Sequence, residues 1–145
     1  METLTKSLDD RKHIKWNNKY YTGISIIDEE HKKLIGILNK TIFAKKHNDN
    51  PEEIKEVLSE MAKYSQKHFS TEEAYMIKFN FPEYQSHRNE HLDFKDKTIA
   101  SYNKLVRGDY QIANELLEYL KGWLINHIQV TDKKYIDCFK KNGLK

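Results

Sequence analysis

The chain has few residues of the types that break helices or cross-link a fold. Among its 145 residues there are two prolines, five glycines and one cysteine, Cys138. A single cysteine excludes a disulfide within the chain, and Cys138 is interpreted as a small side chain of the last helix. Scarce proline and glycine, beside abundant Lys, Glu, Leu and Ile, favour long helices over a sheet.

Long apolar runs are also absent. No stretch approaches the roughly 20 apolar residues that span a bilayer, and the N-terminal METLTKSLDDRKH lacks the apolar region of a signal peptide. We therefore expect a cytoplasmic protein with no membrane partner. The net charge is +3, but acidic and basic residues are interspersed along the chain. This pattern predicts no nucleic-acid partner, and the basic C-terminal stretch is interpreted as a solvated helix end.

Four segments carry apolar residues at three- and four-residue steps, the period of an amphipathic helix. These stripes run over 24–42, 54–79, 84–105 and 112–128, and a further helical stretch follows through Phe139. The breaks between the segments are short: HNDN followed by Pro51, then Asn80-Phe81-Pro82, then Gly108.

Short connections make successive helices antiparallel neighbours. The sequence therefore predicts an all-α fold, an antiparallel up-down-up-down four-helix bundle with an N-terminal arm and a short C-terminal helix. We expect a single domain over 1–145, with the arm at about 1–23, the bundle at about 24–131 and a C-terminal helical tail at about 132–145.

Several polar residues fall within the apolar stripes instead of opposite them. They are His31, His68, Glu72, His87, His91 and His127. Four residues advance a helix by about 40° beyond one turn, so residues at this spacing, such as His68 and Glu72, lie on one face. A carboxylate buried among apolar residues costs several kcal/mol unless a positive charge compensates it. Histidines from all four helices therefore predict a metal centre, whereas His13 and His47 lie off the stripes and are interpreted as surface residues.

Asp132 fits this pattern less well. It follows His127 by five residues, about 140° around an ideal helix, so the two are not simply stacked. Thr131 has the better spacing, but a hydroxyl is a poor metal ligand. Spacing alone does not decide whether Asp132 is a metal ligand. Other acids near the ligands are interpreted as surface groups or as groups behind the ligands: Glu73, Glu90, Asp93 and Asp96.

The segment HRNEH, 87–91, also fits the H-x-x-E-H signature of a family of zinc peptidases. That interpretation needs Glu90 as a free base, a third ligand and a cleft for an extended peptide. A small bundle offers no such cleft, and His87 and His91 already belong to a set drawn from four helices. We therefore set the peptidase aside.

The order of these residues resembles the hemerythrin family. The resemblance rests on His31, on His68-x-x-x-Glu72, on His87-x-x-x-His91 and on His127-x-x-x-x-Asp132. The segments GISIIDEEHKKLI, HFSTEEAYM, FPEYQSHRNEHLDF and WLINHIQVTDKKY are also similar to bacterial members, so the resemblance covers the chain from about Trp16 to Tyr135.

The resemblance implies a centre of two non-haem iron ions (Fe2+/Fe3+) with a bridging oxo or hydroxo group. By similarity, one iron is held by His87, His91 and His127 and the other by His31 and His68. Glu72 and Asp132 would bridge the irons, which favours Asp132 as a ligand. Dioxygen would bind at the iron with two histidines, in an apolar pocket lined by Trp123, Leu124 and Ile128.

The function implied is reversible dioxygen binding, for storage or delivery, without catalysis. Partners would then be dioxygen and an oxygen-using enzyme or a redox protein, and the chain would be a monomer or a weak oligomer. One alternative is a regulatory module that senses oxygen, nitric oxide or iron. A second is an enzyme at the same site, a di-iron peroxidase, ferroxidase or nitric-oxide reductase.

Overall fold

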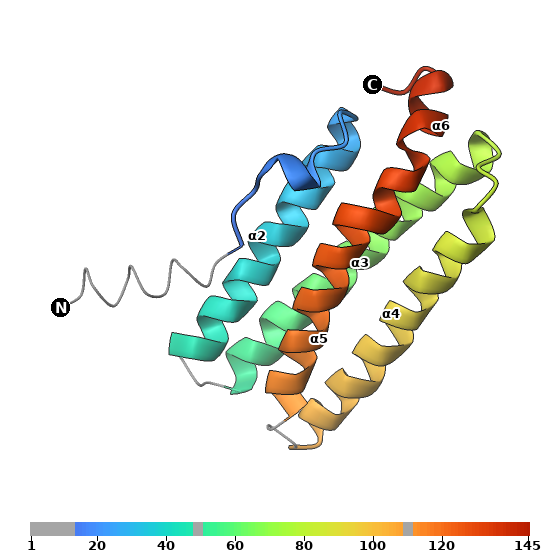
Figure 1. Ribbon diagram of the computed structural model, residues 1–145. Helices are drawn as coiled ribbons and strands as arrows, with labels where there is room; N and C mark the ends of the chain where they lie inside the picture. Colours follow the sequence, from blue (N-terminus) through green and yellow to red (C-terminus); the bar gives the residue numbers. More distant parts are fainter. Residues whose placement is uncertain (1–13, 48–50, 109–111) are drawn as a thin grey trace.

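A computed structural model describes residues 14–47, 51–108 and 112–145. Four long helices dominate it: α2 (Ser25–His47), α3 (Pro51–Lys78), α4 (Tyr84–Val106) and α5 (Ile112–Asn126). Successive helices run antiparallel and pack against each other in turn, and α5 closes the bundle against α2 (Figure 1). The predicted fold class, an all-α up-down-up-down bundle, is confirmed.

The chain continues beyond α5 along the same axis. A π-helical turn, η2 (His127–Thr131), is followed by a 3-10 turn, η3 (Asp132–Tyr135), and by the short helix α6 (Ile136–Lys141). Figure 1 shows this red segment extending past the other helices at one end of the bundle. No helix in the described ranges combines the length and the apolar character that crossing a bilayer requires.

Local sequence explains where the helices begin and end. Asp28, predicted as an early acidic residue of the first helix, accepts hydrogen bonds from the backbone of Thr22 (2.8 Å) and Gly23 (3.1 Å). An acid in this position complements the unpaired N–H groups of the helix start. Asn80 has φ +53° in the turn that ends α3, a conformation that Asn tolerates better than most residues.

The arm before α2 lies against the bundle. Its 3-10 turn, η1 (Asn18–Tyr20), places the Tyr20 ring in a buried cluster with Ile35 and Ile128. The Ile14 N–H donates to the Asn39 side chain at 2.8 Å, and the Asn39 amide donates back to the Ile14 carbonyl. His13 and the side chain of His47 lie outside the described part of the structure, so their predicted surface positions stay predictions.

Two apolar clusters fill most of the interior. One includes Leu34, Met61, Phe94 and Leu124, and the other is grouped around Ile24, Ile27, Met76, Phe81, Tyr135 and Phe139. Along every helix the predicted polar ligands fall between residues of the first cluster and residues of the second. The bundle therefore holds one polar layer between two apolar blocks.

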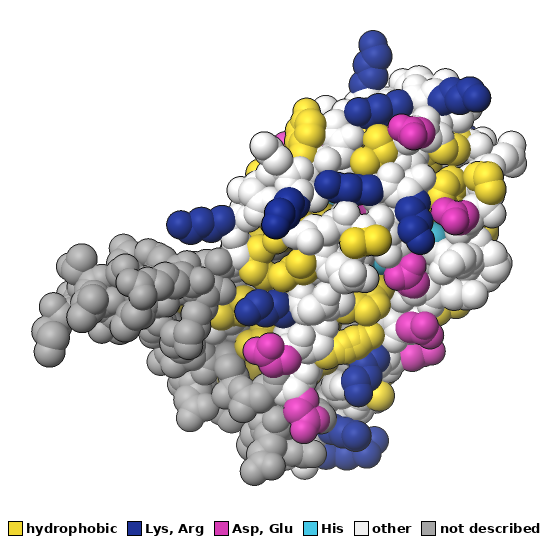
Figure 2. All heavy atoms as spheres, viewed as in Figure 1, with side chains coloured by type: hydrophobic (Ala, Val, Ile, Leu, Met, Phe, Trp, Pro, Cys, Tyr) yellow, Lys and Arg dark blue, Asp and Glu magenta, His cyan; other side chains and the backbone are white. Residues whose placement is uncertain are grey.

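The outer surface carries mixed charge. On the face drawn in Figure 2, lysine and acidic side chains are interspersed and histidine is almost hidden. This agrees with the expectation that charge is not collected into one extended patch on that face.

Candidate metal centre

Seven polar side chains meet in the layer between the two apolar clusters. None is more than 2% exposed, and they come from α2, α3, α4 and the two turns that follow α5, η2 and η3: His31, His68, Glu72, His87, His91, His127 and Asp132. These are the residues that the sequence predicted as metal ligands. The structure brings all seven of them together.

The seven side chains form two groups that share two carboxylates. His31 and His68 lie with Glu72 and Asp132 in one group, and the second group combines the same carboxylates with His87, His91 and His127. Within each group the candidate ligand atoms lie within 4.8 Å of one another. Glu72 and Asp132 therefore stand where each could contact two ions at once.

The shortest contacts join imidazole Nε2 atoms to carboxylate oxygens. Asp132 Oδ2 lies 2.8 Å from His31, and its Oδ1 lies 2.9 Å from His87 and 2.8 Å from His127. Glu72 Oε1 lies 3.1 Å from His68 and 3.4 Å from His91. Both carboxylates thus contact histidines of both groups.

The π-helical turn places Asp132 in this layer. The backbone N–H of Asp132 donates to the carbonyl of His127, a bond across five residues. Such a turn holds more residues than an α-helical turn, so residues five apart come to one face. On an ideal α-helix they would not, which is why spacing alone left Asp132 undecided.

Several atoms in the layer lack the partners that buried polar groups need. Although they lie close to one another, no contact with hydrogen-bond geometry reaches either oxygen of Glu72, Oδ1 of Asp132, or Nε2 of His68 and His87. Two ring nitrogens, Nε2 of His91 and Nε2 of His127, face each other at 3.1 Å. Buried donors and acceptors are normally paired, and such atoms converging on common points are the arrangement that cations satisfy. The residues present therefore fit a pair of metal ions.

The outward nitrogens of three histidines face further carboxylates. Nδ1 of His68 lies 2.8 Å from Glu30, and Nδ1 of His91 lies 2.9 Å from Glu73. Nδ1 of His127 is 3.8 Å from a third acid, Glu90.

Each of these acids has a partner of its own. Thr71 donates to Glu30, Thr131 donates to Glu90, and Arg88 lies 3.6 Å from Glu73. Carboxylates behind metal-binding histidines fix the tautomer and the ring orientation. The interpretation of Glu73 and Glu90 as groups behind the ligands agrees with these contacts.

Without metal, opposite charges in the layer stabilise each other. Burial opposes a charge on His68, but the negative charge of Glu72, together with the carboxylates of Asp132 and Glu30 beside the ring, outweighs burial and holds the pKa of His68 well above its usual range. In the same way, the charge of Asp132 outweighs burial and holds the pKa of His127 well above its usual range.

The two carboxylates shift in the opposite direction. Burial acts to raise the pKa of Glu72 and of Asp132, and so does repulsion from Asp132 in the case of Glu72. The neighbouring histidines outweigh both effects and hold the two pKa values well below their usual range. In the metal-free chain, protons therefore take part of the role that cations would play.

Aromatic rings enclose the layer. The ring of Trp123 stacks on His127, with centroids 4.3 Å apart, and Phe69 stacks on His91 at 3.9 Å. Leu124 and Ile128, also predicted to line the oxygen pocket, are buried on either side of His127 along the chain. Ligands are thus held among apolar side chains.

Three residues beside the centre were missed in the sequence. Glu30 precedes His31 and therefore lies off the apolar stripe, and Phe69 lies beside His68 in the same way. Tyr135 was recognised only as an apolar stripe residue, yet its hydroxyl is buried without a hydrogen-bond partner. Burial, followed by the charges of Asp132 and Glu72, raises the pKa of Tyr135 well above its usual range. Only the tertiary arrangement reveals these roles.

A four-helix bundle that buries five imidazoles and two shared carboxylates in one layer defines a class of metal-binding bundle proteins. Comparisons with known proteins specify the family. Residues 22–139 match the family model for the Hemerythrin HHE cation binding domain. The chain belongs to the hemerythrin family, as its sequence indicated.

Individual relatives agree with this family assignment. The bacteriohemerythrin of Clostridium acetobutylicum is 32% identical over 128 residues, covering 84% of this chain and 98% of that protein. The bacteriohemerythrin of Stenotrophomonas maltophilia is 31% identical over 125 residues, covering 86% of this chain and 80% of that protein. A crystal structure of wild-type hemerythrin superposes with a TM-score of 0.79 at 25% identity, covering 87% of this chain and 97% of that one.

Proposed function

We propose that this protein binds dioxygen reversibly at a non-haem di-iron centre, for oxygen storage or delivery. The observation that carries the proposal is the buried layer itself: two groups of candidate ligands that share Glu72 and Asp132. Family membership and the bacteriohemerythrin relatives support the same function.

The division of the ligands follows the two groups. His87, His91 and His127 would hold one iron, and His31 and His68 would hold the other. Glu72 and Asp132 would bridge the two. The second iron then has one protein ligand fewer, which leaves a coordination position for dioxygen.

The composition of the ligand set favours binding over further chemistry. Bundles of the ferritin-like di-iron class use carboxylate-rich sets with Glu-x-x-His motifs, and anionic ligands stabilise high-valent iron. Here five neutral imidazoles stand against two carboxylates. When bound, the iron pair supplies electrons that dioxygen takes up and returns on leaving. We therefore propose a carrier and no catalytic role.

The surrounding side chains have two roles in this proposal. Glu30 and Glu73 accept hydrogen bonds from His68 and His91, which keeps each Nε2 directed toward a metal. Trp123 and the other apolar residues near His127 keep water away from the centre, and a dry site resists irreversible oxidation.

Some finer features stay predictions. They are the cytoplasmic location, the monomer or weak oligomer, the single domain with the boundaries given above, and the bridging oxo or hydroxo group. An oxygen-using enzyme as the recipient of the oxygen is likewise a proposal that follows from the storage or delivery role.

Metal analysis combined with absorption spectra under nitrogen and under air tests the proposed function. We expect two irons per chain, a spectrum that appears when the ferrous protein meets oxygen, and its loss on degassing. Zinc, with a filled d shell, would give no colour. One-way oxidation, with no ferrous form recovered by degassing, contradicts reversible binding.

A further inference from the structure

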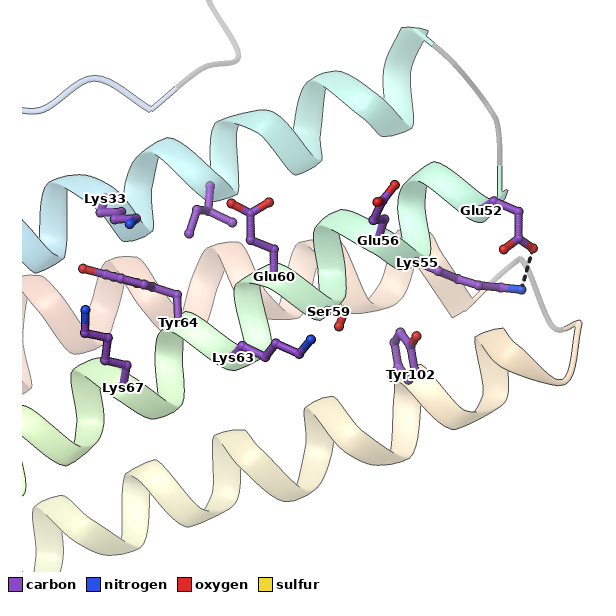
Figure 3. A pocket seen from close by; sticks show the side chains of 11 residues that line it. Lys33, Glu52, Lys55, Glu56, Ser59, Glu60, Lys63, Tyr64, Lys67 and Tyr102 are labelled. Carbon is purple, nitrogen blue, oxygen red and sulfur yellow. Dashed lines mark hydrogen bonds and ion pairs between the residues drawn. The ribbon is translucent and has the colours of Figure 1, made fainter.

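A groove of about 800 Å³ runs over the outer side of α3, between α2 and α4. At one end Lys33 of α2 and Lys67 of α3 lie beside the ring of Tyr64, and Lys63 extends along α3 on the other side of that residue (Figure 3). We call these four residues the lysine end of the groove. Acidic residues line the opposite end, where Glu52 and Glu56 lie.

The lysine end carries positive charge that the described chain does not neutralise. The Lys33 ammonium lies 4.8 Å and the Lys67 ammonium 5.6 Å from the centroid of the Tyr64 ring. Among the described residues, none of the three lysines forms an ion pair with a carboxylate.

Two of the three acidic side chains of the groove differ in this respect. Glu60 pairs with Lys40 at 3.2 Å, and Glu52 pairs with Lys55 at 3.0 Å. The charge of these two acids is locally compensated. The lysine end with its three lysines therefore faces only one further acid of the groove, Glu56 at the opposite end, and the excess charge of the groove is positive. Such an excess steers anionic partners toward this surface.

The lysine end lies next to the half of the metal centre that has two histidines. Tyr64 precedes His68 by one helical turn on α3, and Lys33 follows Glu30 by about one turn on α2. Glu30 contacts the outward nitrogen of His68 at 2.8 Å. Burial and then the charge of Glu30 raise the pKa of Tyr64. The lysine end and the two histidines His31 and His68 therefore lie on neighbouring turns of α2 and α3.

We propose that the lysine end docks an acidic one-electron carrier protein, which reduces the iron centre after it has been oxidised. This inference rests on the proposed function. Each docking event transfers one electron from the carrier to one ferric ion, leaving a ferrous ion and an oxidised carrier. Two events restore the pair. A protein suits the site better than a small anion, because the groove is open and extends over three helices.

Two lysines with similar surroundings allow a matched test. Lys67 lies 5.6 Å from the ring of Tyr64, and Lys97 lies 5.8 Å from the ring of Tyr119, away from the groove. We compare Lys67→Glu with Lys97→Glu. The probe is a reduced plant-type ferredoxin, an acidic one-electron protein with a potential of about −400 mV, mixed anaerobically with the ferric protein at low salt.

Charge reversal at a docking site acts mainly on the association rate. We expect Lys67→Glu to lower the second-order rate of reduction about tenfold and to weaken its dependence on salt, and Lys97→Glu to change the rate by less than about twofold. Reduced methyl viologen, a cation, should reduce both variants at least as fast as the wild type. Slowing with both reductants, or equal slowing in both variants, overturns the proposal.

Binding provides a second readout that needs no iron chemistry. Calorimetric titration of the zinc-loaded chain with ferredoxin should give a dissociation constant that rises about tenfold in Lys67→Glu. If inorganic phosphate binds at the lysine end and ferredoxin does not, the site takes small anions and the docking proposal is wrong. If the chain binds ferredoxin at the lysine end but does not bind oxygen, the proposed function is wrong and the docking surface is supported.

Discussion

Asp132 Oδ1 lies 2.8 Å from His127 Nε2, although the two residues are five positions apart on one helical segment. The π-helical turn between them rotates less per residue than an α-helix, so residues five apart come to one face. Turns of this kind are rare in proteins, and those that occur are often found at functional sites. Here the turn adds a carboxylate to the polar layer, and that carboxylate contacts histidines of both ligand groups.

The first prediction concerns this carboxylate. We expect Asp132→Asn to reduce the iron content from two per chain to one or none, because the amide keeps the shape but loses the charge that faces two cations. Elemental analysis after anaerobic reconstitution measures the result. Asp137→Asn, at an exposed position on α6, is the matched control and should retain both irons. Full iron content in Asp132→Asn would mean that Asp132 is not a bridge.

The second prediction concerns Glu30, which is not itself a predicted ligand but contacts one, His68. Glu30→Gln should weaken metal binding about 10- to 100-fold, the usual effect of replacing the carboxylate behind a ligating histidine, because the amide can still accept a hydrogen bond but carries no negative charge. Competition with a coloured chelator measures the affinity. The neighbouring Glu29 carboxylate is exposed and pairs only loosely with Lys32 at 3.9 Å, so Glu29→Gln should leave the affinity unchanged. Equal effects in the two variants would count against a role for Glu30.

The third prediction is a pH dependence that reverses sign when metal is bound. In the metal-free chain the pKa values of His68 and His127 are raised above the ordinary 6.5. Their contribution to the free energy of unfolding is therefore complete below pH 6.5 and is lost as the pH rises through the raised values. The lowered pKa values of Glu72 and Asp132 act at acidic pH, where stability is lost as these carboxylates take up protons.

Metal ligation requires neutral imidazole, so protons compete with the ions. The extra stability that metal gives should therefore increase as the pH rises above 6.5. Anaerobic thermal unfolding of the metal-free and metal-loaded chains over this range measures the difference. Parallel curves for the two forms would show that metal does not replace protons at His68 and His127.

Much of this structure could be predicted from the sequence because the information is local. A helix that buries one face shows its period in the sequence, and a histidine or a glutamate on that face stands out against its apolar neighbours. Glu72, for example, could be assigned to the polar layer from its four-residue distance to His68. The four helices and six of the seven residues in the layer followed in this way.

The remaining features depend on how the helices pack. Glu30 reaches His68 only because α2 and α3 have a particular rotation and offset, which the period of either helix does not specify. Phe69 could not be assigned to His91 for the same reason. The π-helical turn at 127–131 has no periodic signature of its own. The family resemblance, and not spacing, favoured Asp132.

The fourth prediction tests the apolar pocket. Ile128 is 1% exposed and packs with Tyr20 and Ile35. Ile128→Ala should destabilise the fold by about 2–5 kcal/mol, keep both irons and release oxygen faster, since the enlarged pocket loses contacts. Val130, 53% exposed, gives the control: Val130→Ala should change stability by less than about 0.5 kcal/mol. Unchanged oxygen release in Ile128→Ala would remove Ile128 from the pocket.

The last prediction returns to the segment HRNEH. In a zinc peptidase of that signature Glu90 would be the base that activates water. In the structure Glu90 instead accepts a hydrogen bond from Thr131 at 3.1 Å, and it lies 3.8 Å from the outward nitrogen of His127. Glu90 therefore lies behind the His127 ring, outside the space between the predicted ligands. We expect Glu90→Gln to keep two irons per chain and a reversible oxygen spectrum, and neither form to cleave unstructured peptides with iron or zinc. Metal-dependent cleavage by the wild type that disappears in Glu90→Gln would restore the peptidase interpretation.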